Sequence, residues 1–456
     1  MGDDELCAAL GEAVNDQLQR GPAIEPRYLR DWSPIEPGAP LAVVRPATTA
    51  EVAAVLKLCH AARRPVVPQG GRTGLAGAAV PGAGEVVLSL ERLTGVEEVD
   101  ASGATLVARA GTPIATVQDA AADHGLMLPL DLGSRGSATV GGTIATNAGG
   151  NRVLRYGMMR DMVLGLEAVL ADGTVLSGLN RMLKNNAGYD LKHLFIGSEG
   201  TLGVVTRAVL RLRARPRSRA TALCAINDFD HVVDLLRHLD GALGGQLSAF
   251  EVMWRNYYAP AVETVGQAPL SPEHAFTVLI ESQGGEPAAD AARFEAALDE
   301  AMTGGLVAEA VVARSGAEET NLWAVRDAIA DMASGMAPYL AYDVSLPTAA
   351  MERFVNAALA ALERTLPDHR SVVFGHVADG NLHLVSHVDE AAHDKVDALI
   401  FGLVADAGGS ISAEHGIGRL KRAYLDRSRS PEEIATMRAM KRALDPHGIL
   451  SPGRVF

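Results

Sequence analysis

The chain has 456 residues, of which 48% are hydrophobic and 21% charged, a composition typical of a globular protein with two or three domains. Its formal net charge of −14 argues against a nucleic-acid-binding protein, which would carry a basic surface. The densest basic stretch, residues 211–219, alternates arginine with other residues. It predicts an exposed strand that leads into a domain linker.

The three cysteines, Cys7, Cys59 and Cys224, are far apart and form no Cys-x-x-Cys pair. This spacing argues against a disulfide framework, a zinc ribbon and an iron–sulfur cluster, and it favours a reducing, cytoplasmic setting. The acidic start of the chain, Asp3-Asp4-Glu5, is unlike a signal or transit peptide. No run of about 18 apolar residues occurs, so we expect no membrane span.

In the first part of the chain, helix and strand signals alternate around a glycine-rich loop. Thr48 and Glu51 form a capping box, and the apolar residues that follow have helical spacing. A short strand at 65–68 then leads into the glycine-rich loop at 69–77. Further strands are predicted at 85–89 and 105–108, and a helix at 115–123.

The densest glycine region, residues 129–157, precedes a hairpin turn at 171–174 and a second glycine-containing segment at 184–206. After Pro216 the glycine loops become rare, and strands alternate with helices. This change predicts an antiparallel sheet with helices on one face, and the whole chain is expected to be α+β. Predicted elements of the second part are strands at 220–226 and 276–281, helices at 230–239 and 287–298, and a final helix before the tail at 445–454.

The glycine-rich loops indicate a site for phosphate groups, because backbone N–H groups can approach phosphate oxygens where no Cβ intervenes. Neither loop has the G-x-G-x-x-G pattern between a strand and a helix. A single loop could equally serve a tight turn. Two loops together with the segment 199–203 favour an extended dinucleotide.

A second site is indicated at residues 375–384, where Asp379-Gly380 between two apolar runs predicts a two-residue type I′ hairpin. With the turn there, His376 faces His383, at a Cβ separation of about 5 Å. Two imidazoles set that close can share a metal ion, although the pair alone could also be polar residues facing water. Glu414-His415 downstream adds a carboxylate and another imidazole and favours the metal.

Together these motifs resemble the FAD-linked D-2-hydroxyacid dehydrogenases, whose fold is the PCMH type shared by vanillyl-alcohol oxidase and p-cresol methylhydroxylase. The matching segments are 68–74, 129–157, 188–192, 195–206, 376–384 and 413–418. The resemblance implies a PCMH-type FAD-binding domain of two α+β subdomains at 37–216. It also implies an antiparallel-sheet substrate (cap) domain of the FAD-linked oxidase C-terminal type at 217–430. Residues 431–456 are expected to form a helix and tail that return to the FAD domain.

The resemblance further implies FAD, and the first glycine loop contains neither His nor Cys to which the flavin could be tethered, so we expect non-covalent FAD. Its pyrophosphate is expected near 70–74 and its ring against 142–150. The expected FAD contacts are Pro68, Gln69, Gly70, Gly71, Arg72, Thr73, Gly74, Leu75, Pro129, Leu130, Asp131, Gly136, Ser137, Gly141, Gly142, Ala145, Thr146, Asn147, Gly149, Gly150, Tyr156, Gly157, Glu199, Gly200, Gly203, Val204, Val205, Asn381 and Glu414.

The same resemblance assigns a divalent metal, most often zinc, to His376, His383 and Glu414. His415 matches the general base, and Arg326 matches the arginine that binds the substrate carboxylate. The implied reaction is oxidation of a D-2-hydroxy acid to the 2-oxo acid, with hydride transfer to the flavin. The further expected substrate positions are Ala330, Ala341, Tyr342 and Val385.

Three of these substrate positions depart from the pattern of members that act on hydroxyglutarate. Those members carry threonine, lysine and asparagine where this chain has Ala330, Ala341 and Val385, and Ser451 replaces a further asparagine. A buried carboxylate without partners costs several kcal/mol. We therefore expect a 2-hydroxy acid with a side chain less polar than that of hydroxyglutarate.

The alternatives are an oxidase of the D-lactate or glycolate type that uses oxygen, and D-2-hydroxyglutarate dehydrogenase proper. A flavin-free zinc hydrolase and an inactive flavin-binding subunit are further possibilities. The electron acceptor is expected to be a separate carrier, such as an electron-transferring flavoprotein or a quinone. A homodimer is also an expectation.

Overall fold

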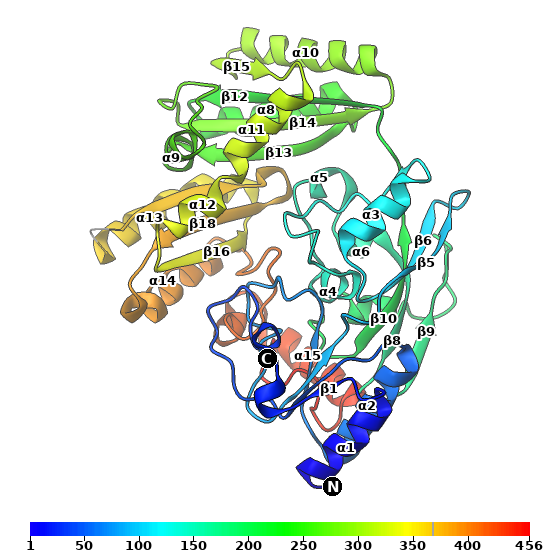
Figure 1. Ribbon diagram of the computed structural model, residues 1–456. Coiled ribbons are helices and arrows are strands. Elements are labelled where there is room, and N and C mark those ends of the chain that lie inside the picture. Colours follow the sequence, from blue (N-terminus) through cyan, green and yellow to red (C-terminus); the bar gives the residue numbers. More distant parts are fainter. Residues whose placement is uncertain (367–368) are drawn as a thin grey trace. The chain divides into compact units, whose positions relative to one another are not determined.

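The computed structural model describes residues 1–366 and 369–456 and separates the chain into two compact units (Figure 1). Unit 1 comprises Met1–Gly150, Gly157–Arg215 and Glu414–Phe456, and unit 2 comprises Asn151–Tyr156 and Pro216–Ala413. The chain therefore enters unit 2 twice, and the C-terminal helix, red in Figure 1, belongs to the same unit as the blue N-terminus.

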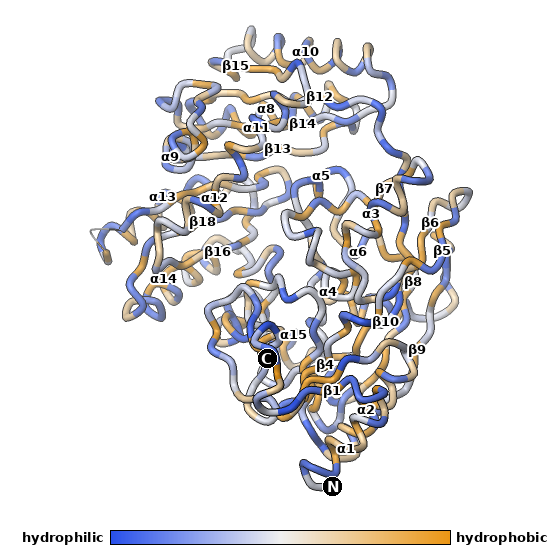
Figure 2. Tube along the Cα trace, viewed as in Figure 1, coloured by the Kyte–Doolittle hydropathy of each residue, from blue (hydrophilic) through white to orange (hydrophobic). Residues whose placement is uncertain are grey.

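A four-stranded sheet in unit 1 has the order β1-β2-β4-β3. Strands β2, β4 and β3 are parallel, and β1 pairs with β2 in the antiparallel sense. The adjacent side chains of Val43, Val67 and Val87 are fully buried against Tyr28, and this part of the chain is strongly hydrophobic in Figure 2. The bounds are β1 Leu18–Gln19, β2 Ala42–Val44, β3 Val66–Gln69 and β4 Val86–Ser89.

A five-stranded sheet in unit 1, in the order β5-β6-β10-β8-β9, is antiparallel throughout. The predicted hairpin turn is confirmed, because Val169 pairs with Val175 and Gly173 has a φ of 87°. The bounds are β5 Val96–Asp100, β6 Thr105–Arg109, β8 Val163–Val169, β9 Val175–Gly178 and β10 Val204–Arg211, with a separate pair of β7 Leu126–Met127 and β11 Arg213–Ala214.

One helix of unit 1, α2, begins at the cap that the sequence predicts. Thr48 accepts a hydrogen bond of 3.1 Å from the amide of Glu51 at the start of α2, and Thr139 caps α4 in the same way. The predicted helix at 115–123 is α3. The bounds are α1 Asp3–Ala13, α2 Thr49–Ala62, α3 Ile114–Ala122, α4 Val140–Thr146, α6 Met159–Met162, α7 Lys192–Phe195 and α15 Pro431–Leu444.

Unit 2 is built on one seven-stranded antiparallel sheet in the order β15-β12-β14-β13-β17-β18-β16. Strands β13 and β14 are buried at every residue and β12 is buried from Thr221 onward, as expected for strands that are covered on both faces. The bounds are β12 Ser218–Ile226, β13 Leu247–Trp254, β14 Phe276–Gly284, β15 Glu309–Val312, β16 Tyr339–Ser345, β17 Ser371–Gly375 and β18 Asn381–His387.

Helices cover both faces of this sheet, so the prediction of helices on one face was wrong. Leu279 on β14 packs with Tyr257 of α9 and Leu322 of α11. Phe276, three residues before Leu279 and therefore on the opposite face, packs against Phe229 of α8. The bounds are α5 Val153–Tyr156, α8 Phe229–Leu243, α9 Arg255–Val265, α10 Pro287–Thr303, α11 Gly316–Asp327, α12 Ile329–Ser334, α13 Met351–Thr365 and α14 His393–Asp406.

Within the described residues, every helix is too short or too polar to cross a lipid bilayer. This agrees with the expectation from the sequence.

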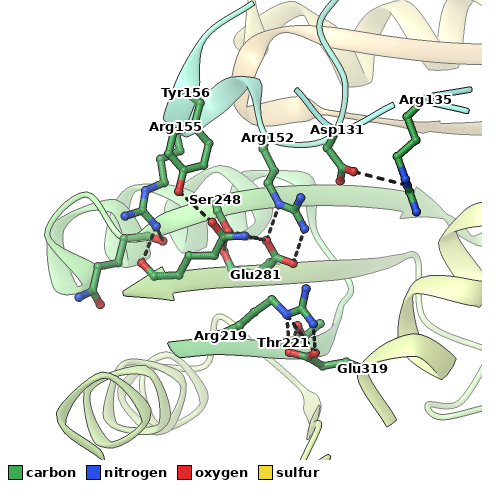
Figure 3. Close-up of polar contacts among 12 residues, drawn as sticks. Asp131, Arg135, Arg152, Arg155, Tyr156, Arg219, Thr221, Ser248, Glu281 and Glu319 are labelled. Atoms are coloured by element: carbon green, nitrogen blue, oxygen red, sulfur yellow. Dashed lines mark hydrogen bonds and ion pairs between the residues drawn. The ribbon is translucent and has the colours of Figure 1, made fainter. Parts of the chain in front are cut away.

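The segment Asn151–Tyr156 is held in unit 2 by a buried ion pair, drawn in Figure 3. Arg152 donates two hydrogen bonds, of 2.9 and 3.2 Å, to the carboxylate of Glu281 on β14. Glu281 is fully buried and also accepts hydrogen bonds from Ser248 and Gln283. Burial raises the pKa of Glu281, but the hydrogen bonds and the charge of Arg152 outweigh it and lower the pKa.

We expect Glu281→Gln to lower the free energy of unfolding at pH 7 by about 3 kcal/mol, because it leaves Arg152 without its carboxylate. The folded-state pKa of Glu281 lies below its unfolded value of about 4.3, so the contribution of its charge is complete above that pH and is lost as the pH falls further. Urea unfolding at several pH values should therefore show the two proteins converging in acid. Equal stabilities at pH 7 would contradict the role given to this pair.

Candidate active site

One face of the unit 2 sheet carries polar side chains among apolar ones. Directly paired residues share a face, and side chains two apart on a strand do so as well. Met253 pairs with Phe374, which pairs with His383, so Glu251, two residues before Met253, lies on the same face as His383. Arg326 at the end of α11 contacts this face by a hydrogen bond to Glu251.

The connection between β17 and β18 differs from the predicted two-residue turn. His383 pairs with Phe374 rather than with His376, and residues 377–379 form a 3-10 turn. Only Gly380 has a positive φ, of 90°, whereas a type I′ turn requires it at both central residues. The predicted register was therefore wrong by two residues. A shift of two leaves every side chain on its own face, so the face of His383 is unchanged.

The two imidazoles nevertheless meet at the end of the hairpin. The ring centroids of His376 and His383 are 5.4 Å apart and the rings are nearly perpendicular. A ring nitrogen of one lies within 4.8 Å of a ring nitrogen of the other. Bonds from zinc to histidine nitrogen are about 2.0–2.1 Å long, so small rotations suffice for both rings to bind one ion.

The carboxylate of Glu251 connects His376 with Arg326. Its Oε1 lies 2.5 Å from Nδ1 of His376, and its Oε2 accepts a hydrogen bond of 2.8 Å from Nε of Arg326. Burial alone would raise the pKa of Glu251, but the charge of Arg326 and the hydrogen bonds from His376 and Arg326 lower it. The carboxylate is therefore an anion although its side chain is only 1% exposed.

Our sequence analysis missed Glu251, although the sequence contains a signal for it. The residue lies in the middle of β13, whose other residues are apolar or small and are all buried. A buried carboxylate in such a strand requires a cationic or hydrogen-bonding partner. The signal predicts a partner but does not identify it, because both Arg326 and His376 are distant in sequence.

We call His376 and His383 the His pair. The predicted substrate positions Val385, Ala341 and Ala330 lie on or beside the sheet face of this pair, and Tyr342 does not. Val385 pairs directly with Ala341 and packs in an apolar cluster with Phe374 and Met332. Ala330 is exposed on α12, which contributes Met332 to that cluster. Tyr342 alternates with Ala341, so it faces the other side of the sheet. There its hydroxyl donates to Asp397 of α14 at 2.7 Å.

In unit 1, the two glycine-rich segments pack backbone against backbone. A Cβ on Gly71 would lie 1.9 Å from the carbonyl oxygen of Ser137, and one on Gly70 would lie 2.4 Å from Oγ1 of Thr139. Protein packing alone therefore requires glycine at these two positions. The sequence analysis explained them by contact with a ligand or by a tight turn, and it did not predict the packing of one segment on the other.

Other parts of these segments leave room that suits an anionic ligand. A Cβ on Gly136 would meet no atom within 4 Å, and one on Gly74 would meet only Asp31, at 3.9 Å. The guanidinium of Arg72 is in the same loop and lies over the ring of Tyr28. Oε1 of Gln69 is buried and has no hydrogen-bond partner within the described part of the chain. The positive charge of Arg72 and the open space at the glycines suit a pyrophosphate group. The unsatisfied oxygen of Gln69 could accept a hydrogen bond from a hydroxyl group of the same dinucleotide.

The chain after Glu414 is held in unit 1 by Glu199, which the sequence analysis assigned to cofactor contact. The Glu199 carboxylate accepts hydrogen bonds of 2.8 Å from the amides of Ile417 and Gly418. Burial raises the pKa of Glu199 in spite of these bonds. Glu414 itself accepts a hydrogen bond of 2.5 Å from the amide of Gly150, so the acidic-His segment contacts the second glycine-rich region.

The structure divides the remaining predicted FAD contacts between the units. Asn381 and Tyr156 belong to unit 2. Asn381 is buried, donates to Asp343 at 2.7 Å and leaves its Oδ1 without a partner among the described residues. Unit 1 contains Pro68, Thr73, Leu75, Pro129, Leu130, Asp131, Gly141, Gly142, Ala145, Thr146, Asn147, Gly149, Gly157, Gly200, Gly203, Val204 and Val205.

A cavity of about 370 Å³ in unit 2 contains none of the predicted site residues. Its lining includes the paired residues Trp254 and Phe276, which lie on the sheet face opposite Glu251, together with Leu359 of α13. Its position separates it from the His pair.

Comparison with known families matches both parts of the chain. The family described as FAD linked oxidases, C-terminal domain, matches residues 215–455, and the FAD binding domain family matches residues 40–178. The first match includes Glu251, Arg326 and the His pair, and the second includes both glycine-rich segments. The p-cresol methylhydroxylase structure covers 99% of this chain and 96% of its own, with a TM-score of 0.80 and 15% identity, which shows a shared fold.

Curated relatives match over most of their length. The D-2-hydroxyglutarate dehydrogenase of Xanthomonas citri pv. viticola is 41% identical over 96% of this chain and 94% of its own. The mitochondrial D-2-hydroxyglutarate dehydrogenase of Bos taurus is 38% identical over 100% of this chain and 84% of its own. With the FAD-binding fold and the polar cluster described above, these matches show that the chain belongs to the family of FAD-linked oxidases that contains the D-2-hydroxyglutarate dehydrogenases.

Proposed function

We propose that this protein oxidises a D-2-hydroxy acid to the 2-oxo acid, with FAD as the hydride acceptor and with a divalent cation at the substrate site. The observation that carries the proposal is the convergence of Arg326, His376 and His383 on one sheet face of a chain with an FAD-binding domain. A cationic fork and a pair of imidazoles suit a ligand that offers a carboxylate beside a hydroxyl.

We assign the cation to His376, His383 and Glu414. The two imidazoles are close enough to share an ion, as described above. Glu414 follows Ala413, whose amide donates to Oδ2 of Asp343 at 3.2 Å, and Asp343 is the strand partner of His383. Two histidines and a carboxylate suit zinc and leave coordination positions for substrate oxygens.

The chain's own groups have distinct tasks in this proposal. Arg326 binds and orients the substrate carboxylate, and His415 accepts the proton of the hydroxyl group. Burial of Arg326 and its bond to Glu251 restrict its motion, which favours one orientation of the substrate. The bound cofactors would supply the hydride acceptor and a Lewis acid for the hydroxyl group.

We place the FAD pyrophosphate at the glycine-rich loop around Arg72 and the flavin ring along the segment 142–150. The open side of Gly74 and Gly136 and the unsatisfied Gln69 support this position. The binding is proposed to be non-covalent, so acid denaturation should release all flavin into the supernatant.

Gly71→Ala should reduce the FAD content of purified protein at least tenfold, because its Cβ would force apart the backbones of the two glycine-rich segments. Flavin absorbance per polypeptide measures this. The matched control is Gly133→Ala, in the second segment, whose Cβ would meet no atom within 4 Å. Normal FAD content in Gly71→Ala would contradict the proposed cradle.

The substrate side chain is proposed to be less polar than that of hydroxyglutarate, although the curated relatives carry that substrate in their names. Val385 is 5% exposed in a cluster with Phe374 and Met336, which supplies no partner for a second carboxylate. Desolvating an unpaired carboxylate costs several kcal/mol.

The value of kcat/KM for D-2-hydroxyisocaproate should therefore exceed that for D-2-hydroxyglutarate. Ala341→Lys, at an exposed position that pairs with Val385, should raise kcat/KM for D-2-hydroxyglutarate about tenfold through a new charged hydrogen bond. Tyr339→Lys, two residues earlier on the same strand face, is the matched control. A wild-type preference for D-2-hydroxyglutarate or D-malate would refute the apolar assignment.

Anaerobic addition of the preferred D-2-hydroxy acid should bleach the flavin absorbance, and removal of the metal by a chelator should slow bleaching at least a hundredfold. Arg326→Met should raise KM strongly, since the substrate carboxylate loses its bidentate partner. Peroxide release in air tests the oxidase alternative. Undiminished bleaching after complete metal removal would contradict the metal-assisted mechanism.

Three further expectations remain proposals. Electrons are proposed to leave the flavin to an electron-transferring flavoprotein or a quinone, and the protein is proposed to act in the cytoplasm. Some relatives, including that of Bos taurus, are named as mitochondrial proteins. A homodimer is proposed from family resemblance alone.

A further inference from the structure

Glu251 is placed so that each of its carboxylate oxygens has a different partner in the candidate site. Oε1 meets Nδ1 of His376 at 2.5 Å, and Oε2 meets Nε of Arg326 at 2.8 Å. The side chains of all three residues are at most 10% exposed. One buried carboxylate therefore contacts both a proposed metal ligand and the proposed substrate-binding arginine.

We infer that Glu251 is a positioning residue that holds His376 in the orientation and tautomer needed for metal binding and at the same time holds Arg326 toward the substrate. This inference rests on the proposed function and deepens it. Glu251 itself touches neither substrate nor cofactor in this assignment.

The contacts of His376 select one tautomer. A carboxylate at Nδ1 can only accept, so Nδ1 carries the proton. The guanidinium of Arg326 lies 3.4 Å from Nε2, and because a guanidinium can only donate, it favours a lone pair on Nε2. Both neighbours therefore place the lone pair of His376 on Nε2, the ring nitrogen that a cation would bind in place of the guanidinium. Metal-binding histidines commonly donate their other N–H to a carboxylate, and loss of that carboxylate typically weakens metal binding 10- to 100-fold.

The second histidine lies beside a different carboxylate. Nδ1 of His383 is 3.7 Å from Oδ1 of Asp343, beyond hydrogen-bond distance. Asp343 instead accepts from Asn381 at 2.7 Å and from the amide of Ala413 at 3.2 Å. Glu251 therefore contacts its imidazole at hydrogen-bond distance, whereas Asp343 is farther from the ring nitrogen of His383.

The test measures metal affinity directly. The FAD-loaded protein is stripped of metal and titrated with Zn²⁺ against a competing chelator, and with Co²⁺ while its visible spectrum is recorded. Glu251→Gln should weaken Zn²⁺ binding 10- to 100-fold and alter the Co²⁺ spectrum. Its matched control is Glu281→Gln, which neutralises another buried, arginine-paired glutamate on the same sheet face and should bind both ions as wild type does.

A second comparison keeps the test informative if Glu251→Gln folds poorly because Arg326 loses its counter-ion. Arg326→Gln and the double variant Glu251→Gln/Arg326→Gln both lack the buried guanidinium. The difference between their Zn²⁺ affinities therefore reports the contact of Glu251 with His376. The double variant should bind Zn²⁺ at least tenfold more weakly than Arg326→Gln. Glu251→Gln should in addition raise KM, because Arg326 is no longer held.

The outcomes separate this inference from the proposed function. If wild type binds no Zn²⁺, the proposed metal centre is refuted and the role of Glu251 with it. If wild type binds Zn²⁺ and His383→Ala abolishes binding, but both Glu251 variants bind as tightly as their parents, only the role of Glu251 is refuted.

Discussion

The buried charge of Glu251 is the constraint around which the substrate side of this protein is organised. A carboxylate in the interior of a seven-stranded sheet is tolerated only when both oxygens have strong donors. Arg326 and His376 supply them from a helix and from a loop that lie far away in sequence. Removal of Glu251 or of Arg326 would break the buried ion pair between them, so folding itself favours the geometry that the proposed chemistry uses.

A different constraint shapes unit 1, where backbone segments approach too closely for any side chain. Gly70 and Gly71 face Ser137 and Thr139 without room for a Cβ, and Gly418 faces Ala76 in the same way. The contacts of Glu199 with the residues after His415 then tie the acidic-His segment into this glycine-rich framework. The glycine-rich segments therefore pack tightly at some glycines and leave open space at others, namely Gly74 and Gly136.

Local signals in the sequence predicted the elements well, and the missing information was mostly long-range. The cap at Thr48, the Asp172-Gly173 turn and the α+β class depend on neighbours in sequence. The register of β17 and β18 was wrong by two residues because the 3-10 turn depends on contacts that a turn motif does not encode. The Arg152–Glu281 pair and the partners of Glu251 involve residues at least 75 positions apart. The alternation rule still placed His383 on the correct face, because a register error of two preserves side-chain direction.

The central claim is that one cation binds between the imidazoles of His376 and His383, beside an arginine that recognises the substrate carboxylate. Anomalous diffraction at the zinc edge, from crystals of catalytically active protein grown with Zn²⁺, tests it most directly. The account predicts a single strong anomalous peak within bonding distance of Nε2 of His376 and of a ring nitrogen of His383. An active enzyme whose crystals contain zinc only elsewhere, with these two imidazoles bound to protein groups alone, would contradict it.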